Sequence, residues 1–205
     1  MVDNQIKSNF SGAKNFIEMK RQHKEESLSG PGSHLKNTQE VISFINTIIS
    51  RHNITSILDL GCGDWNWFKH VNLNGASYEG WDCDDDMVSM LNEKYGNDKV
   101  CFKVKDISTE LFEKVDLIIC RDVLFHIETD IGASIVERCK LSSKYFLSTT
   151  FKNVTKNTSI KKYTQFDNWG YYKINLDIEP FGLEPYEIDT VYEPAMKRNF
   201  SLYQW

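Results

Sequence analysis

The sequence predicts an α/β fold with a mostly parallel β-sheet that helices cover on both faces. Short apolar runs alternate with amphipathic segments between residues 54 and 150, which indicates strands joined by crossover helices. The first run turns sharply through two closely spaced glycines, and two later runs each end in an aspartate. With 205 residues the chain is long enough for one such domain with a core and too short for two of ordinary size.

The amino-terminal residues predict an extension that precedes this domain. Isolated apolar positions indicate a short amphipathic helix over residues 12–23, and the composition of residues 26–33, Glu-Ser-Leu-Ser-Gly-Pro-Gly-Ser, is typical of a loop. Apolar residues at helical spacing then predict a helix over 35–51. We therefore divide the chain into an extension with its Gly/Ser loop, residues 1–35, and one domain, residues 36–205.

The alternating region supplies the strands and helices of the domain. Its apolar runs are β-prone, and the segments between them have helical periodicity or helix-initiating residues. The predicted strands are 55–60, 77–82, 100–105, 115–121 and 143–150. The predicted helices are 64–71, 84–95, 108–113 and 130–140.

The pattern changes after residue 150. Residues 152–170 are polar and rich in lysine, so we expect a long loop, and residues 152–175 as a whole are candidates for a mobile segment on the acceptor side. Two β-prone runs, 186–192 and 200–205, follow and are separated by Glu-Pro-Ala and a short polar stretch. They predict an antiparallel hairpin at the sheet edge.

Composition limits the classes of protein that the chain can represent. The net charge is −5, no apolar stretch approaches the length of a membrane span, and the amino terminus lacks the apolar core of a secretory signal. The five cysteines are widely spaced without a Cys-x-x-Cys pair, which argues against a zinc site or a disulfide framework. We expect a cytoplasmic protein with free thiols.

The strongest functional signal is the glycine turn together with the acids that follow it. The sequence Asp-Leu-Gly-Cys-Gly-Asp occupies 59–64, and Asp82 and Asp106 close the next two strand-like runs. Because parallel strands end at the same edge of a sheet, these groups should line one crevice. One carboxylate can accept hydrogen bonds from two vicinal hydroxyls, and a second carboxylate can accept one from an exocyclic amine. The negative charge of such a pocket also favours a sulfonium cation.

This arrangement resembles the class I methyltransferases that use S-adenosylmethionine (SAM). The resemblance implies a Rossmann-like, doubly wound, mostly parallel seven-stranded sheet with a C-terminal antiparallel hairpin. It implies that Gly61 and Gly63 pack under the methionine and ribose of the cofactor, that Asp82 binds both ribose hydroxyls, and that Asp106 faces the adenine. The full set of implied cofactor-binding residues is Asp59, Gly61, Cys62, Gly63, Asp64, Trp67, Asp82, Asp106, Ile107 and Arg121.

A nicotinamide-binding Rossmann protein is the main alternative, because it also has a Gly-x-Gly turn and a downstream acid. Its fingerprint requires a third glycine where this chain has Asn66. It also places a pyrophosphate at the helix amino terminus, where Asp64 would bring a negative charge. Both differences favour SAM over a dinucleotide.

The fourth predicted strand ends in Cys-Arg-Asp-Val-Leu-Phe-His at 120–126. The resemblance implies that the backbone near Arg121 lines the methionine moiety and that Asp122 and His126 face the acceptor. Methyl transfer needs alignment and exclusion of water, and a base is needed only if the acceptor carries a proton. His126 titrates in the range that suits a hydroxyl or amine acceptor. It and Asp122 are the candidate catalytic residues, and a helix-capping or loop-fixing histidine is the alternative.

The loop at 27–33 offers amides and hydroxyls for an anion or a sugar, or it is simply a linker. The chain resembles a less characterised branch of the superfamily that carries Glu-Ser-x-Ser-Gly-x-Gly-Ser there, Cys-Arg-Asp-x-Leu-x-His after the fourth strand, and Asn-Leu followed by Pro-Phe-x-Leu at 175–183. Relatives in that branch are often associated with surface-polysaccharide modification. The resemblance implies O-methyl transfer to a small polar acceptor, such as a sugar or a nucleotide-linked or phosphate-containing, and thus anionic, precursor of a surface polysaccharide.

Other acceptors and ligands are less favoured. The Asp-Pro-Pro-aromatic motif of base-amine methyltransferases is absent, and no basic stripe runs through the domain, so we expect no DNA partner. An RNA or protein N-methyltransferase that uses the lysine-rich loop, or a non-catalytic SAM-binding partner protein, remains an alternative. The acids at 84–86 open a predicted helix, where negative charge is stabilised, and we predict no metal site.

Overall fold

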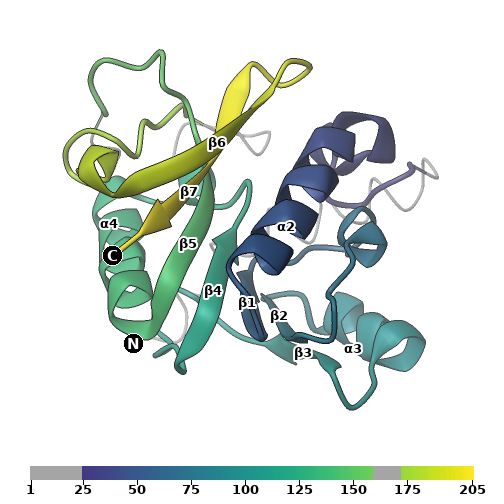
Figure 1. Cartoon of the computed structure of the whole chain (residues 1–205). Helices are drawn as coiled ribbons and strands as arrows, with labels where there is room; N and C mark the ends of the chain where they lie inside the picture. Colours follow the sequence, from purple (N-terminus) through teal and green to yellow (C-terminus); the bar gives the residue numbers. More distant parts are fainter. Residues whose placement is uncertain (1–24, 159–171) are drawn as a thin grey trace, which may run out of the picture.

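The predicted fold class is confirmed. The computed structural model describes residues 25–158 and 172–205, and its seven strands form one sheet in the order β3-β2-β1-β4-β5-β7-β6 (Figure 1). β7 runs antiparallel to both of its neighbours, whereas the other pairings are parallel. The strands are β1 Ser56–Leu60, β2 Ser77–Asp82, β3 Val100–Val104, β4 Val115–Cys120, β5 Ser143–Thr150, β6 Glu187–Glu193 and β7 Arg198–Gln204.

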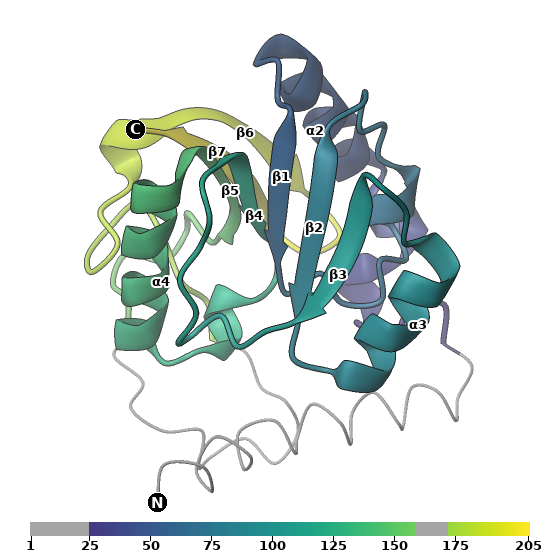
Figure 2. The same ribbon diagram turned by 90° about the horizontal axis from the view of Figure 1, so that it is seen from below.

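Within the described residues, three α-helices cover the sheet on its two faces (Figure 2). α2 (Gln39–Arg51) and α3 (Asp85–Tyr95) pack on one face, and α4 (Thr129–Ser142) packs on the other. In α2 the apolar positions recur at helical spacing, so one stripe is almost fully buried. The predicted helix at 35–51 begins only at Gln39, because 3-10 turns at Pro31–Ser33 and Leu35–Asn37 precede it.

The helix predicted at 64–71 is wrong, since only a 3-10 turn forms at Phe68–His70. Trp65 adopts a left-handed backbone with φ of 56°, which a bulky residue rarely does and an α-helix cannot include. Its indole is buried beside Tyr78, Tyr95 and Phe102, with ring centroids 5.0–5.5 Å away. Packing of this aromatic cluster overrides the local helical pattern.

The helix predicted at 108–113 is also wrong, and the connection from β3 to β4 is a turn followed by extended chain. Arg138 of α4 takes over the hydrogen bonding that a helix would have supplied. Its guanidinium donates to the carbonyls of Ile107 (2.7 Å), Ser108 (3.1 Å) and Glu110. The sequence pattern could not show that a side chain from another element satisfies these groups.

The segment after β5 completes the α4 face of the core. Leu176, Phe181 and Leu183 are buried there. The Asn157 amide donates to the carbonyls of Asn175 (2.8 Å) and Glu179 (2.9 Å), which ties residues 152–158 to this segment. The predicted helix at 12–23 and the rest of the lysine-rich loop, 159–171, lie outside the described residues.

Candidate functional site

The glycine turn leaves β1 at the carboxyl edge of the sheet. Gly61 and Gly63 have φ of 78° and 57°, in the left-handed region that favours glycine. A Cβ at Gly61 would lie 2.4 Å from Cγ2 of Val123, and one at Gly63 would lie 2.2 Å from Oγ of Ser29. Both glycines are therefore required by close contacts as well as by backbone conformation.

Asp82 lies at the end of β2, next to this turn. One carboxylate oxygen accepts from the Gly63 amide (3.0 Å) and the other from the Asp84 amide (3.1 Å). Burial raises the pKa of Asp82, although these amide donors oppose the shift. The predicted ribose acid and the second glycine are thus in direct contact.

The third strand end contributes Asp106 and Ile107. Oδ1 of Asp106 accepts from the amide (2.8 Å) and hydroxyl (2.6 Å) of Ser108, and the Ile107 side chain is buried. Because β3, β2 and β1 are neighbours in the sheet, their carboxyl ends bring Asp106, Asp82 and the glycine turn to one edge. The sequence-based grouping of these residues agrees with the topology.

Asp59 precedes the turn and is only 4% exposed. It accepts a hydrogen bond of 2.7 Å from the Tyr78 hydroxyl. Burial raises the pKa of Asp59 to about 7, and the nearby Asp82 charge adds to the effect, while Tyr78 and Arg121 oppose it. The adjacent Cys62 thiol is also buried, which raises its pKa well above the ordinary value and keeps it neutral.

We expect Asp59 to make stability depend on pH. Between its unfolded pKa, near 4, and its folded pKa, about 7, the folded state holds a proton that the unfolded chain has released. The contribution of Asp59 to the free energy of unfolding is therefore greatest below pH 4. It falls by on the order of 1 kcal/mol per pH unit between pH 4 and pH 7. Asp59→Asn should lack this decline in urea unfolding. Parallel pH profiles for the two proteins would contradict the assignment.

Arg121 and Asp122 belong to a closed ring of four charges. Arg121 contacts Asp122 (3.3 Å) and Glu193 (2.5 Å), and Arg198 contacts the same two carboxylates (2.5 and 3.2 Å). Three of the four side chains are almost completely buried. The ring joins the end of β4 to both strands of the hairpin.

The ring determines the chemistry available to Asp122. Burial alone would raise its pKa, but the guanidiniums of Arg121 and Arg198 outweigh this effect and hold the pKa below the ordinary value. The Thr149 hydroxyl donates to the other oxygen (2.8 Å). Asp122 has a left-handed φ of 61°. These contacts favour a positioning role for Asp122 over proton transfer.

His126 lies on the 3-10 turn Leu124–His126 and is half-buried, with its ring 4.6 Å from that of Phe125. Trp67 is buried, and the Arg121 guanidinium lies over its ring at 5.0 Å. The Asp64 carboxylate binds the loop at 27–29. Trp67 and Asp64 therefore contact residues that surround the turn, Trp67 through Arg121 and Asp64 through the loop at 27–29.

Sequence reasoning missed Glu193 and Arg198 as members of the site. Each residue flanks the turn of the hairpin, and opposite charges at the two ends of a hairpin turn indicate an ion pair. Nothing in the sequence indicated that this pair also meets the end of β4. Only the antiparallel placement of β7 beside β5 brings them there.

The described part of the lysine-rich loop is less available to an anion than its composition suggests. Lys152 is already paired with Glu187 (2.5 Å) and Asp177 (3.9 Å). Lys173 lies over the Phe151 ring, and Lys156 is exposed. Lys161 and Lys162 lie outside the described residues. The described part therefore offers little concentrated positive charge.

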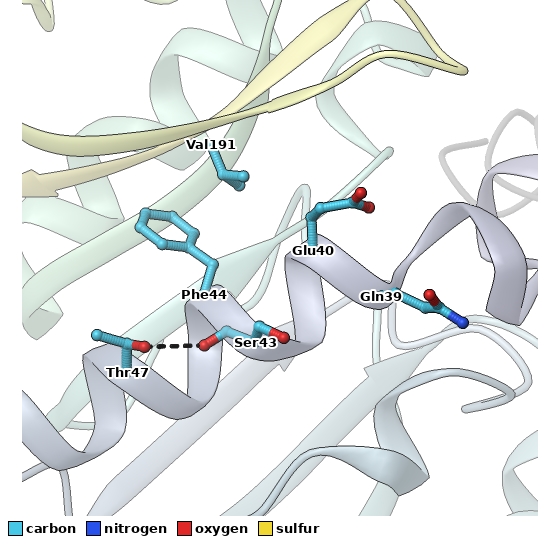
Figure 3. A pocket seen from close by; sticks show the side chains of 6 residues that line it. All are labelled: Gln39, Glu40, Ser43, Phe44, Thr47 and Val191. Atoms are coloured by element: carbon cyan, nitrogen blue, oxygen red, sulfur yellow. Dashed lines mark hydrogen bonds between the residues drawn. The ribbon is translucent and has the colours of Figure 1, made fainter.

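Two further features do not carry the predicted chemistry. An open groove of about 410 Å³ lies between α2 and β6, and none of the predicted site residues lines it (Figure 3). The carboxylates of residues 84–86 approach one another within 4.8 Å, but Asp84 caps α3 by accepting from the Met87 amide (3.0 Å). In the described ranges no helix has the length and apolarity needed to cross a bilayer.

Comparison with known proteins gives one family model and several solved structures that this chain resembles. Residues 57–141 match the family model described as a methyltransferase domain. A magnesium protoporphyrin IX methyltransferase from Synechocystis, crystallised with SAM, superposes with a TM-score of 0.58 at 16% identity, covering 82% of this chain and 80% of that one. We found no match among curated proteins.

Two other solved structures share the fold. TehB from Haemophilus influenzae has a TM-score of 0.59 at 16% identity, covering 81% of this chain and 62% of that one. An O-methyltransferase family protein from Burkholderia thailandensis has a TM-score of 0.57 at 12% identity, with coverages of 82% and 55%. At these identities the matches show the fold alone.

Proposed function

We propose that this protein is a SAM-dependent methyltransferase that transfers the methyl group to an oxygen of a small polar acceptor. The observation that carries the proposal is the meeting of the glycine turn, Asp82 and Asp106 at adjacent strand ends of one sheet. The methyltransferase-domain match, at residues 57–141, includes the glycine turn, Asp82 and Asp106.

The residues at this edge fit the cofactor chemically. Gly61 and Gly63 leave the turn without side chains, Asp82 offers carboxylate oxygens to the ribose hydroxyls, and Asp106 with Ile107 provides an acceptor and an apolar surface for the adenine. Asp59 and Cys62 line the base of the turn, while Arg121 contributes backbone near the methionine. When bound, SAM supplies an electrophilic methyl group on a sulfonium.

His126 is the candidate base. A neutral imidazole there would accept the proton that an acceptor hydroxyl loses as its oxygen becomes the nucleophile. Asp122, held ionised in the charge ring, would fix the backbone of the turn that carries this histidine. The remaining contribution of the protein is to align the acceptor and exclude water.

For the acceptor we propose a sugar, or a nucleotide-linked or phosphate-containing precursor of a surface polysaccharide. The branch motifs support this choice, and O-methyltransferases occur among the structural neighbours. The net charge of −5 and the paired Lys152 disfavour a nucleic acid. The five free cysteines are compatible with the proposed cytoplasmic location.

The proposal is tested by calorimetry followed by an activity screen. We expect SAM and its product S-adenosylhomocysteine to bind, and NAD not to bind. A panel of nucleotide sugars and sugar phosphates, incubated with SAM labelled in its methyl group, should then yield a labelled product. His126→Ala should lower kcat and leave SAM affinity unchanged. Binding of NAD in place of SAM would refute the function.

A further inference from the structure

The loop at 27–33 is built onto the glycine turn far more firmly than a linker needs. The Asp64 carboxylate accepts from the Leu28 amide (2.7 Å) and from the hydroxyls of Ser27 (3.1 Å) and Ser29 (3.2 Å). In return the Asp64 amide donates to the Ser29 hydroxyl (3.1 Å). Ser27 is only 1% exposed. One carboxylate thus organises three successive residues of the loop.

Both ends of the loop are fixed as well. Asn66 donates to the carboxylate of Glu26 and to the carbonyl of Ser33, each at 3.0 Å. The Arg121 guanidinium donates to the Gly32 carbonyl (2.9 Å). The loop therefore bridges the turn after β1 and the turn after β4.

The position of the loop indicates which part of the bound cofactor it would face. Ser29 lies against Gly63, whose amide binds the Asp82 carboxylate, and a Cβ on Gly32 would lie 2.9 Å from Oδ2 of Asp122. These contacts are all at the β1 and β4 ends. The described contacts of the loop do not include Asp106 or Ile107, at the adenine end of the site.

We propose that residues 27–33 form the wall of the cofactor pocket over the methionine end, and that Asp64 is the positioning residue that holds this wall. The inference rests on the proposed function, because it takes the strand ends as a SAM site. It adds a binding element that the glycine-turn motif does not contain. The contact between this loop and the glycine turn also explains why Ser27 is buried and why residue 63 is a glycine.

The wall can be tested with two ligands that differ only at the methionine end. S-adenosylhomocysteine carries the amino acid group, whereas 5′-methylthioadenosine does not. Asp64→Asn should weaken S-adenosylhomocysteine binding about tenfold, since charge-assisted hydrogen bonds hold the wall, and should change 5′-methylthioadenosine binding less than about twofold. Ser29→Ala, which removes one hydroxyl, should show the same selectivity with a smaller effect.

Asp86→Asn is the matched control, because it removes the same charge from an exposed position at the start of α3. It should bind both ligands as the wild type does. Equal weakening of both ligands by Asp64→Asn and Ser29→Ala, or no weakening by either, would overturn the inference. If the wild-type protein binds neither ligand, the proposed function fails first, so the two failures are distinguishable.

Discussion

Asp82→Ala is expected to abolish detectable SAM binding. The carboxylate is the proposed partner of both ribose hydroxyls, and each charge-assisted hydrogen bond contributes roughly 1.5–3 kcal/mol. Loss of two such bonds corresponds to a weakening of about 100-fold or more. Alanine also frees the amides of Gly63 and Asp84, which the carboxylate now holds, so the turn itself would lose its shape.

Calorimetry with S-adenosylhomocysteine measures this effect, with thermal unfolding recorded in parallel to verify that the variant folds. Asp86→Ala serves as a control for loss of charge near the site, because Asp86 is exposed on the first turn of α3. Affinity within a few-fold of wild type in a folded Asp82→Ala protein would refute the assignment of the ribose site.

Of the substitutions considered, Glu193→Gln is expected to lower the free energy of unfolding the most. The Glu193 side chain is 2% exposed and is bound by Arg121 and Arg198 on its two oxygens. Without its charge, two buried guanidiniums share only Asp122. Breaking one partner out of a buried ion pair costs about 3–5 kcal/mol. The variant should unfold at a much lower urea concentration.

Asp189→Asn provides a matched control, since Asp189 also belongs to β6 and pairs with Arg51 at a position where both side chains are substantially exposed. Exposed pairs contribute about 0–1 kcal/mol. The double variant Glu193→Gln/Arg198→Met restores a neutral cluster and should be less destabilised than the two single changes would sum to. Strict additivity, or a Glu193→Gln effect no larger than the control, would contradict the charge ring.

The parts of the fold that were predictable are those with a strong local pattern. Strand-like apolar runs, the stripe of α2 and the hairpin at the carboxyl terminus are where the sequence predicts them. The failures, at 64–71 and 108–113, both lie in connections. There a tertiary contact, the aromatic cluster around Trp65 or the guanidinium of Arg138, replaces a helix. Local propensity is a weak prior against such packing.

The sequence by itself determined the fold class and the proposed cofactor edge, because motif spacing fixes which residues follow each strand and parallel strands all end at one edge. Only the tertiary structure decided how Asp64, Arg121 and Asp122 are used. Their partners are separated from them by tens of residues, in the loop at 27–33 and in the hairpin. Hydrogen bonds and ion pairs over such separations leave no periodic trace in a single chain, so the walls of the site emerge only when the chain is folded.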